Sequence, residues 1–506
     1  MRDWGVLGRV RPIEHPGAIR LMCGIVGIVS SSPVNQQVYD ALALLQHRGQ
    51  DSTGIATSDG SIIHMQKAKG QVREAYRTRD MRSLLGTMGL GHVRYATRGD
   101  ANKEQEAQPF YVNAPYGIVL VHNGNLTNTR ELTEELFHID RRHLNTNSDT
   151  ELLVNVLAHE LQHQVRGTDL DPDQVFDAIE TLHERVEGSY AAIALIAGQG
   201  LLAFRDPFGI RPLILGKRSA GLVGTEWIVA SESLVLESAG YEVVRDVAPG
   251  EAIFIARNGE MYSRQCAKNP VLIPCSFEYV YLARPDSVMN GISVYEARLR
   301  LGDRLADTIA KYTPSGAIDV VMPIPDSSRP AAMQVAQKLG IEYREGFYKN
   351  RYVGRTFIMP GQEQRTKSVK QKLNAMGSEF RGKNVLIVDD SIVRGTTSRE
   401  IIDMARQAGA NSVTFTSAAP PVRYPHVYGI NMPSRQELVA SGRKIPEIAT
   451  ELGADYLIYQ EVADMQAAII EGSGIERLEM SCFTGDYVTG TVTPEYLAWV
   501  EANQLS

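Results

Sequence analysis

Long hydrophobic runs are missing from this sequence of 506 residues. No stretch approaches the ~18 to 20 uninterrupted apolar residues that span a bilayer. The first 22 residues carry charges throughout and lack the apolar centre of a signal peptide. Cysteine is scarce too, and its positions lie far apart: Cys23, Cys266, Cys275 and Cys482. This spacing argues against a disulfide framework and indicates a reducing, cytoplasmic environment.

An excess of basic residues is also lacking. The formal net charge is -7 and the isoelectric point is about 5.9, which argues against a general nucleic-acid binder. Small molecules are therefore the expected partners, with no nucleic acid and no membrane. At 506 residues the chain is too long for one ordinary core, and its 43% hydrophobic content supports two domains with appendages.

The most informative stretch runs from Val385 to Thr397 and reads VLIVDDSIVRGTT. Its short apolar run is typical of a strand that is buried on both faces of a parallel sheet. Asp389 and Asp390 then lie at the carboxyl end of that strand, the edge where open α/β sheets bind ligands. The turn that follows supplies hydroxyls and backbone N–H groups at a helix N-terminus, which predicts a phosphate site.

The helix after this turn has its own local signals. Thr397 and Glu400 have the spacing of a capping box, and Gly409 is expected to end the helix. One alternative is an acidic pair that ends an ordinary strand. Another is a kinase-type P-loop at residues 377–384 (GSEFRGKN), but Asn384 stands where Ser or Thr should bind Mg2+, and a strand follows where a helix is needed.

The stretch from Val385 to Thr397 resembles the phosphoribosyl diphosphate (PRPP) loop of type I phosphoribosyltransferases. The resemblance implies a C-terminal domain with a parallel sheet and PRPP contacts from Asp389, Asp390, Ser391, Arg394, Gly395, Thr396 and Thr397. The motif PIPDSSRPAA (323–332) places Ser327 at a second strand end. By the same resemblance Ser327, Asp389 and Asp390 would bind Mg2+, for which hard oxygen ligands are suited.

Cys23 follows Met22 directly, and this junction matters because an N-terminal cysteine carries its own general base. An α-amine with a pKa near ~8 can accept the thiol proton at neutral pH. A peptide bond to the nitrogen of Cys23 would abolish that base. We therefore expect residues 1–22 to be a propeptide or the result of a wrongly assigned translation start. The alternative is a buried structural cysteine in a strand.

Later motifs bear on this choice. They are QHRGQDSTG (46–54), GHVRYATRG (91–99), VHNGNLTN (121–128) and NTNSDTE (145–151). With Cys23 they resemble the class II, N-terminal-nucleophile glutamine amidotransferases in order and spacing, over residues 23–257. The resemblance implies an N-terminal four-layer αββα sandwich of the Ntn-hydrolase type, an α+β fold beside the α/β second domain. Within it, GIVLVHNG (117–124) would be a strand that ends at a polar loop.

This resemblance also implies residue roles. Cys23 would attack the side-chain amide of glutamine, and Asn123 with the backbone N–H of Gly124 would form the oxyanion hole. Arg94 would bind the α-carboxylate of glutamine through its bidentate fork, and Asp149 would bind the α-ammonium group. Taken singly, Arg94 and Asp149 could be surface charges and Asn123 a turn residue. The ordered set of motifs argues against those alternatives.

Other polar residues of the motifs have structural interpretations. His92 and His122 invite a Cys-His dyad, which we discount because the α-amine already supplies the base. Arg48 could be an ion-pair partner within the scaffold. The stretch RDPFGIRPL (205–213) resembles scaffold of the same family.

A locally basic segment spans residues 344–374, with eight Lys or Arg against two Glu. Within it, KNRYVGRTFIMPGQ (349–362) closely resembles the flexible loop of the glutamine PRPP amidotransferase family. The resemblance implies that Lys349 and Arg355 contact PRPP when the loop closes and excludes water. A solvated charged face and a nucleic-acid patch are the alternatives.

Domain limits and the tail follow from the same comparison of motifs. We expect the amidotransferase domain at 23–257, the phosphoribosyltransferase domain at 275–470 and a tail at 471–506. Some members of the family bind an iron-sulfur cluster through four cysteines. Here Cys275 and Cys482 could match, but Glu479 and Gly485 occupy the places three residues either side of Cys482, so we expect no cluster.

Together the two halves imply one activity. The first domain would hydrolyse glutamine, and the ammonia would displace diphosphate from C1 of PRPP in the second, giving 5-phosphoribosylamine in the opening step of purine biosynthesis. The resemblance implies Mg2+, feedback inhibition by purine nucleotides, and a homo-oligomer, with a homotetramer expected. Two alternatives are a class II amidotransferase with another acceptor, such as a sugar phosphate, and a PRPP-sensing regulatory protein. The first leaves 385–397 unexplained, and the second needs a DNA-binding domain, for which no basic recognition helix is visible.

Overall fold

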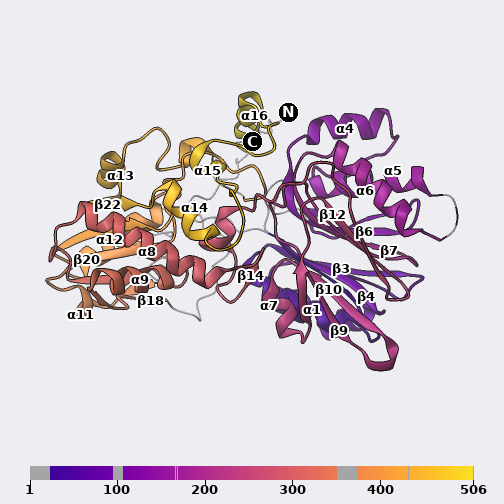
Figure 1. Cartoon of the computed structure of the whole chain (residues 1–506), viewed down its shortest axis with the longest axis horizontal. Coiled ribbons are helices and arrows are strands. Elements are labelled where there is room, and N and C mark those ends of the chain that lie inside the picture. The colour runs from indigo at the N-terminus through magenta and orange to yellow at the C-terminus, as the bar shows by residue number, and fades with distance from the viewer. Residues whose placement is uncertain are drawn as a thin grey trace, which may run out of the picture.

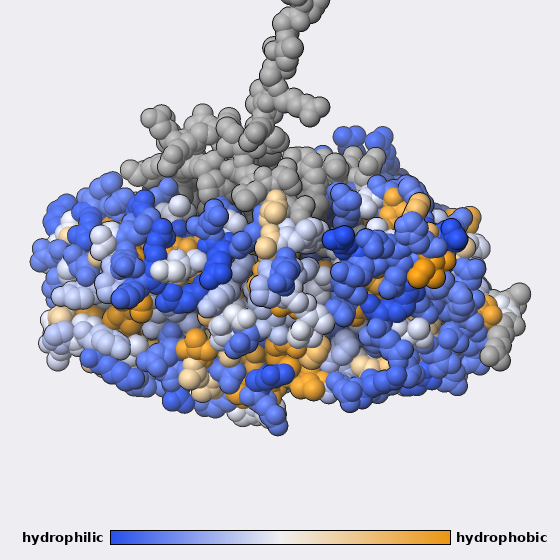
Figure 2. Space-filling view, turned by 90° about the horizontal axis from the view of Figure 1, so that it is seen from above, coloured by the Kyte–Doolittle hydropathy of each residue, from blue (hydrophilic) through white to orange (hydrophobic). Residues whose placement is uncertain are grey.

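The structure, a computed structural model, describes residues 23–94, 106–165, 167, 169–349, 373–430, 432 and 434–504. Figure 1 shows two bodies side by side, with a parallel sheet on the left and two stacked antiparallel sheets on the right. Seen from above, most of the visible described surface is hydrophilic, and hydrophobic residues form scattered groups (Figure 2). Among the described helices, none has the length and apolar character needed to traverse a bilayer.

The first antiparallel sheet has the strand order β11-β9-β10-β1-β4-β2-β3. Its strands are β1 (Gly24–Val29), β2 (Ser52–Ser58), β3 (Ile63–Lys69), β4 (Met88–Arg94), β9 (Ile214–Ser219), β10 (Thr225–Ala230) and β11 (Glu242–Asp246). The second has the order β13-β12-β8-β7-β6-β5. Its strands are β5 (Phe110–Val112), β6 (Ile118–Leu126), β7 (Gly188–Ile196), β8 (Gly200–Arg205), β12 (Glu251–Ala256) and β13 (Met261–Gln265).

Helices cover the outer faces of both sheets. The second sheet packs against α4 (Thr129–His138), α5 (Asp149–Gln164) and α6 (Pro172–Arg185), and the first against α1 (Asn35–Leu44) and α7 (Ser233–Ser238). Between the sheets lies a third core, to which β1 contributes Ile25 and β6 contributes Val121. These layers confirm the predicted αββα sandwich (Figure 1).

Strand β6 differs from its predicted form. The sequence predicted that the strand ends at a polar loop at Gly124, which is wrong: β6 continues to Leu126, and Gly124 pairs with Tyr190 of β7. A Cβ added to Gly124 would lie 2.1 Å from the carbonyl oxygen of Ser189. Because only glycine permits this approach, the Asn-Gly pair serves close strand packing here and forms no turn.

The second half contains a parallel sheet in the order β17-β16-β20-β21-β22. Its strands are β16 (Val320–Pro323), β17 (Glu342–Tyr343), β20 (Asn384–Asp389), β21 (Ser412–Ser417) and β22 (Tyr456–Tyr459). Its covering helices are α8 (Val294–Tyr312), α9 (Arg329–Leu339), α12 (Thr396–Gln407) and α13 (Ile445–Leu452). Val385 lies in the core under α12 and α13, whereas Leu386 lies in the core under α8 and α9. The predicted strand with two covered faces is therefore confirmed.

The start of α12 corrects a second expectation. The helix begins at Thr396 with Gly395 as its N-cap, and Gly395 has a left-handed backbone with φ 77°. The predicted capping box of Thr397 and Glu400 is therefore wrong, since Thr397 already lies inside the first turn. The reason is conformational: the turn from the strand requires a positive φ before the helix, which glycine adopts without strain. Gly409, with φ 98°, follows the end of the helix as predicted.

Four short helical turns are η1 (Leu45–His47), η3 (Gly221–Val223), the π-helix η4 (Glu278–Leu282) and η5 (Arg435–Glu437). Other short strands and helices complete the described chain. They are α2 (Val72–Ala75), α3 (Thr78–Ser83), β14 (Val288–Met289), β15 (Ile292–Ser293), β18 (Phe347–Lys349), β19 (Leu373–Ala375), α11 (Gly377–Phe380), α14 (Val462–Ile470), α15 (Ser481–Thr484) and α16 (Pro494–Gln504). The segment after 471 contributes to a core that the two halves share, since Leu478 and Phe483 are buried in one cluster with Val26 of β1.

Candidate active sites

Cys23 lies directly before β1 and is buried, with 6% of its surface exposed. Its backbone carbonyl accepts a hydrogen bond from Arg48 Nε at 3.1 Å. Because Gly24 pairs with Val93 of β4, Cys23 and Arg94 lie at the same end of these two neighbouring strands. Arg94 is also buried, and its guanidinium contacts Glu106 Oε2 at 3.1 Å.

Asn123 and Gly124 come from the other sheet, on strand β6. Asn123 is 1% exposed, and neither its amide nitrogen nor its amide oxygen has a hydrogen-bond partner among the residues that the structure describes. A buried amide without partners is costly and calls for an explanation. Asp149 begins α5, and its Oδ2 accepts a hydrogen bond from the backbone N–H of Leu126 at 3.2 Å. The Asp149 carboxylate therefore contacts the same strand that carries Asn123.

The two histidines of these motifs are held in neutral form. Burial lowers the pKa of His122, although Asp149 acts in the opposite direction. The Nε2 of His122 lies 3.3 Å from the carbonyl oxygen of Ser189, and its Nδ1 lies 3.4 Å from Thr150 Oγ1. Burial also lowers the pKa of His92 well below its usual range. The ring of His122 is thus engaged in contacts that connect β6 to its neighbours.

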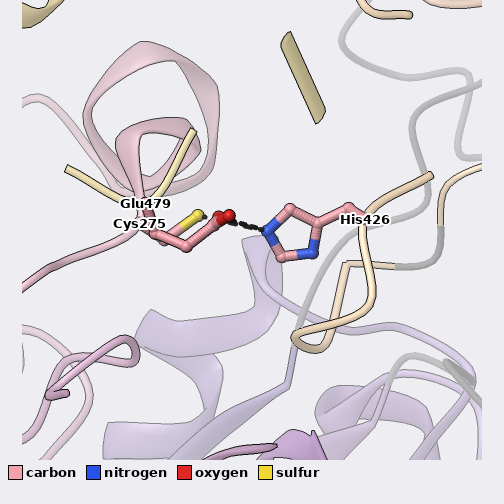
Figure 3. Close-up of side chains that lie close together, drawn as sticks. All are labelled: Cys275, His426 and Glu479. Atoms are coloured by element: carbon pink, nitrogen blue, oxygen red, sulfur yellow. Dashed lines mark hydrogen bonds and ion pairs between the residues drawn. The ribbon is translucent and has the colours of Figure 1, made fainter. Parts of the chain in front are cut away.

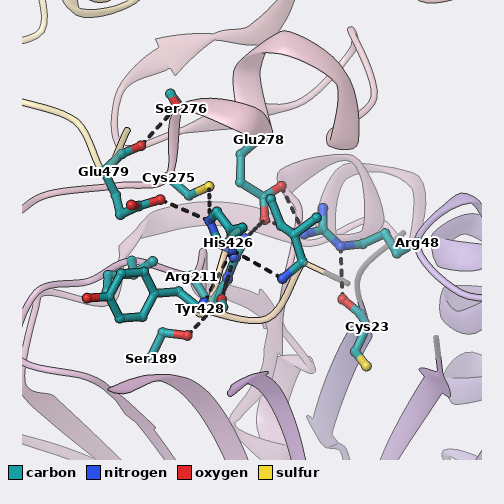
Figure 4. Close-up of polar contacts among 12 residues, drawn as sticks. Cys23, Arg48, Ser189, Arg211, Cys275, Ser276, Glu278, His426, Tyr428 and Glu479 are labelled. Atoms are coloured by element: carbon teal, nitrogen blue, oxygen red, sulfur yellow. Dashed lines mark hydrogen bonds and ion pairs between the residues drawn. The ribbon is translucent and has the colours of Figure 1, made fainter. Parts of the chain in front are cut away.

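A buried cluster of charges lies beside Cys23 (Figure 4). Arg48 donates to Glu232, and its NH2 group lies 2.7 Å from Glu278 Oε1. Burial lowers the pKa of Arg48, but the two carboxylates outweigh this effect and raise it. Arg211 contacts the same Glu278 at 3.4 Å. These contacts agree with the alternative in which Arg48 is a structural ion-pair partner.

Sequence reasoning missed three members of this cluster, Glu232, Arg211 and Glu278. It interpreted the stretch around Arg211 as scaffold and did not single out the two acids. The only local signal was an acidic residue inside the apolar run FEYVYL (277–282). Such a residue indicates a buried ion pair but does not identify its partner.

The second site lies where β16 and β20 end. Asp389 is the last residue of β20, and Asp390 follows it in buried surroundings. Ser327, which follows β16, donates its hydroxyl to Asp390 Oδ2, and Ser391 Oγ donates to Asp390 Oδ1 at 2.8 Å. The structure therefore brings Ser327 and the two acids to one edge of the sheet.

The electrostatics of the acidic pair suit a cation. Burial raises the pKa of Asp389 well above its usual range, and the neighbouring Asp390 adds to the effect. Burial also raises the pKa of Asp390, although hydrogen bonds from Ser327 and Ser391 oppose it. Two adjacent carboxylates and a hydroxyl form a set of hard oxygen donors, which fits Mg2+.

The turn after these acids has the features of an anion site. Thr396 and Thr397 are exposed in the first turn of α12, where backbone N–H groups have no partner within the helix. Ser391 and Gly395 are buried in the turn, and Arg394 contacts Glu437 Oε1 at 3.2 Å.

Two basic residues were predicted to contact the same ligand. Lys349 ends β18, and its half-exposed amine lies 2.9 Å from Asp326 Oδ2, beside the turn that carries Ser327. Arg355 and most of the basic segment lie outside the described residues. Closure of this loop therefore stays a prediction.

A separate cluster contains Cys275, His426 and Glu479, all of them buried (Figure 3). His426 Nε2 lies 2.9 Å from Glu479 Oε2 and 3.6 Å from Cys275 Sγ. The sequence analysis discussed Cys275 and Glu479 as positions where iron-sulfur ligands could lie. It did not predict that both residues contact His426.

Comparisons with known proteins cover both sites. A family model described as "Glutamine amidotransferase domain" matches residues 92–238, and one described as "Phosphoribosyl transferase domain" matches residues 292–429. The amidophosphoribosyltransferase of Pseudomonas aeruginosa is 54% identical over 483 residues, 95% of each chain. That of Escherichia coli is 54% identical over 482 residues, again 95% of each chain.

A solved structure is similar over most of the chain. It is the glutamine PRPP amidotransferase from B. subtilis complexed with ADP and GMP, with a TM-score of 0.81 and 36% identity. The match covers 92% of this chain and 97% of that one.

Proposed function

The chain belongs to the amidophosphoribosyltransferase family, and we propose from this membership that it makes 5-phosphoribosylamine, glutamate and diphosphate from PRPP, glutamine and water. It is a glutamine amidotransferase fused to a glycosyltransferase, and it acts in the first step of de novo purine (IMP) biosynthesis. The observation that carries the proposal is the 54% identity over 95% of both chains, which includes both sites. The amidotransferase domain is assigned to 23–257 together with β13, and the phosphoribosyltransferase domain to 275–470.

In the glutaminase site, the thiol of Cys23 attacks the side-chain amide carbon of glutamine, the C–N bond breaks and ammonia leaves. Water then hydrolyses the resulting thioester to glutamate and regenerates the thiol. The α-amine of Cys23 accepts the thiol proton, so the active form lacks residues 1–22. Asn123 Nδ2 and the N–H of Gly124 donate to the oxyanion. The buried amide of Asn123 has no hydrogen-bond partner among the residues with a described placement, which supports this role, since a donor must be open to bind a developing charge.

The amino-acid part of glutamine is bound by two charged residues. Arg94 binds the α-carboxylate, and Asp149 binds the α-ammonium group. Their positions support this proposal: Arg94 lies at the same strand end as Cys23, and Asp149 contacts the backbone of β6. One charge is thus supplied by the end of β4 in the first sheet, and the opposite charge by the start of α5, which packs on the second sheet.

In the PRPP site, the turn from Ser391 to Thr397 binds the 5-phosphate, and Asp389 and Asp390 face the ribose hydroxyls. Lys349 and Arg355 bind the diphosphate. Ser327, Asp389 and Asp390 would hold Mg2+, which neutralises charge on the leaving diphosphate when it is bound. The contact between Ser327 and Asp390 supports this set of ligands.

Ammonia passes between the two sites inside the protein. In neutral water ammonia is mostly protonated and cannot attack C1 of PRPP. An enclosed route delivers the neutral nucleophile before water protonates it. The shared core, which contains residues of both halves, supports such an enclosed junction.

Purine nucleotides inhibit the enzyme, and the complex of the B. subtilis protein with ADP and GMP supports this. The enzyme is a homotetramer of the cytoplasm, where buried thiols such as Cys266 and Cys275 remain reduced. It uses no iron-sulfur cluster, because Glu479 takes the place of a cysteine.

The test is release of glutamate and diphosphate from purified protein given glutamine and Mg2+, with and without PRPP. Equal release of both products, with glutaminase activity rising on addition of PRPP, is the expected result. Glutamate without diphosphate would indicate another acceptor. Release of neither, from protein shown to begin at Cys23, together with PRPP binding, would favour a sensor.

A further inference from the structure

Residues 425–430, called the bridging loop below, belong to the second half of the chain but lie against strand β6 of the first. Asn125 Nδ2 donates to the carbonyl of Val427 at 2.8 Å. Ser189 Oγ donates to the carbonyl of Tyr428 at 2.8 Å. Gly429 packs closely on Gly124, since a Cβ added to Gly429 would lie 2.9 Å from the Cα of Gly124. The loop therefore contacts β6 at Gly124, the residue whose N–H is assigned to the oxyanion hole.

The bridging loop is also connected to the nucleophile (Figure 4). Arg211 Nε donates to the carbonyl of Tyr428 at 2.7 Å, and Arg211 contacts Glu278 at 3.4 Å. Glu278 in turn pairs with Arg48, whose Nε donates to the carbonyl of Cys23 at 3.1 Å. One run of buried contacts thus joins the loop to the backbone of the nucleophile.

His426 belongs to the bridging loop, and its side chain contacts the backbone of the same loop. Its Nδ1 accepts hydrogen bonds from the backbone N–H groups of Tyr428 at 3.2 Å and Ile430 at 3.4 Å. Its Nε2 lies 2.9 Å from Glu479 Oε2, and Glu479 Oε1 accepts from the N–H of Ser481 at 2.8 Å. Both side chains are fully buried, so their orientation is fixed by these contacts.

Cys275, His426 and Glu479 have the residue types of a metal site, and one atom from each lies within 4.8 Å of the others. The hydrogen bonds of His426 argue against such a site. Because Nδ1 accepts from two N–H groups, the ring proton must be on Nε2, where it is donated to Glu479. A histidine that binds a metal through Nε2 instead donates Nδ1–H to an acceptor. The thiol is protonated too, since burial raises the pKa of Cys275 to about 12.

We propose that His426 and Glu479 form a metal-free hydrogen-bonded pair that holds the bridging loop in position. Through Gly429, the loop in turn positions strand β6, which carries the residues assigned to the oxyanion hole, for glutamine hydrolysis. His426, Glu479 and Gly429 are positioning residues in this account, which rests on the proposed glutaminase function. A small displacement suffices, because misplacing a catalytic group by ~1 Å can cost about 100-fold in rate.

The first test compares two glycine substitutions in the full-length enzyme. Gly429→Ala places a Cβ against Gly124, at a residue with φ 102°. Gly442→Ala is the matched control, because Gly442 also has a positive φ, 68°, but an added Cβ meets no atom within 4 Å. We expect Gly429→Ala to lower kcat for glutamine by about 10- to 100-fold while ammonia-dependent synthesis and the KM for PRPP stay unchanged. An equal loss in Gly442→Ala, or none in Gly429→Ala, would overturn the proposal.

The second test uses His426. His426→Asn keeps an acceptor near the position of Nδ1 but loses the contact with Glu479, and His426→Ala loses both. We expect the asparagine variant to retain more glutamine-dependent turnover than the alanine variant. The metal content of the purified wild-type enzyme is measured as well. Stoichiometric zinc or iron that disappears in His426→Ala would show a metal site and refute the proposal.

A third measurement does not depend on activity. Hydrogen exchange in the peptide that covers β6 should be faster in His426→Ala and Gly429→Ala than in wild type and Gly442→Ala. Unchanged exchange would contradict the proposed support even in an active enzyme. Wild-type protein that hydrolyses no glutamine would instead contradict the proposed function, and the exchange result would still decide whether the loop holds the strand.

Discussion

Replacing Asn123 by alanine should separate catalysis from stability. The side chain is buried at 1% exposure, and its amide makes no hydrogen bond with any residue that the structure describes. If the amide serves the oxyanion, its loss removes a contact that forms only during the reaction. The substitution should therefore affect the transition state far more than the folded state.

The magnitudes can be compared. Loss of one oxyanion-hole donor costs about 100- to 1,000-fold in kcat, or ~2.7 to 4 kcal/mol in the barrier. In the folded state, burying an unpaired polar group costs about 1 to 3 kcal/mol, which Asn123→Ala would relieve. Each methyl-sized void that the substitution leaves costs ~1 kcal/mol. These two terms oppose each other, so we expect the free energy of unfolding to change by less than about 2 kcal/mol.

The assay is glutamate release in the presence of PRPP, with ammonia-dependent synthesis and urea unfolding measured on the same protein. Asn155→Ala is the matched control, because Asn155 is also buried, but its Nδ2 donates to the carbonyl of Glu151 at 2.8 Å. This control should lose about 1 to 3 kcal/mol of stability and keep its kcat. Less than a 10-fold loss of glutamine-dependent turnover in Asn123→Ala, or an equal loss with ammonia, would refute the assignment.

Further predictions concern the nucleophile, the metal site and one buried carboxylate. Cys23→Ala should abolish glutamine use and leave ammonia-dependent synthesis, whereas loss of both would show that the role of Cys23 is misplaced. Active protein whose intact mass still includes residues 1–22 would contradict the α-amine as base. Ser327→Ala and chelation of Mg2+ should each suppress PRPP turnover without changing basal glutaminase; an equal fall in both activities would count against the ligand set. Burial raises the pKa of Glu226, but hydrogen bonds from two serines and Arg218 outweigh it and lower the pKa to about 2. Since the unfolded value is 4.5, this carboxylate stabilises the fold above pH 4.5, and the effect is lost as the pH falls towards 2. Urea unfolding of wild type and Glu226→Gln at pH 7 and at pH 3 checks this. A difference in the free energy of unfolding between the two proteins that does not shrink at pH 3 would contradict it.

Local signals account for what the sequence could predict. The run from Val385 to Val388 alternates between two cores, so its hydrophobicity alone indicated a strand with two covered faces. The contact between Ser327 and Asp390 could be expected from a general rule, because the carboxyl ends of parallel strands lie at the same edge of the sheet. Neither inference needed a contact between distant segments to be known in advance.

Features that depend on tertiary contacts escaped prediction. Asn123 and Gly124 have the composition of a turn, and only the approach of Ser189 on β7 shows why they lie inside a strand. Gly395 displaced the expected cap because the turn before α12 needs a positive φ. Cys275 and His426 are 151 residues apart in the sequence, and no local pattern relates them.

The bridging loop gives a structural reason for the fusion of the two halves. The segment that leads to it begins at Ala418, whose N–H donates to the carbonyl of Asp389 at 2.9 Å, and it ends with Gly429 against Gly124. Residues assigned to PRPP and to the oxyanion are therefore linked through one short stretch of backbone. Contiguity alone does not establish coupling, which requires an element with two arrangements that both sites bias. It does mean that the first half, separated from the second, would lose the residues that pack against its oxyanion strand.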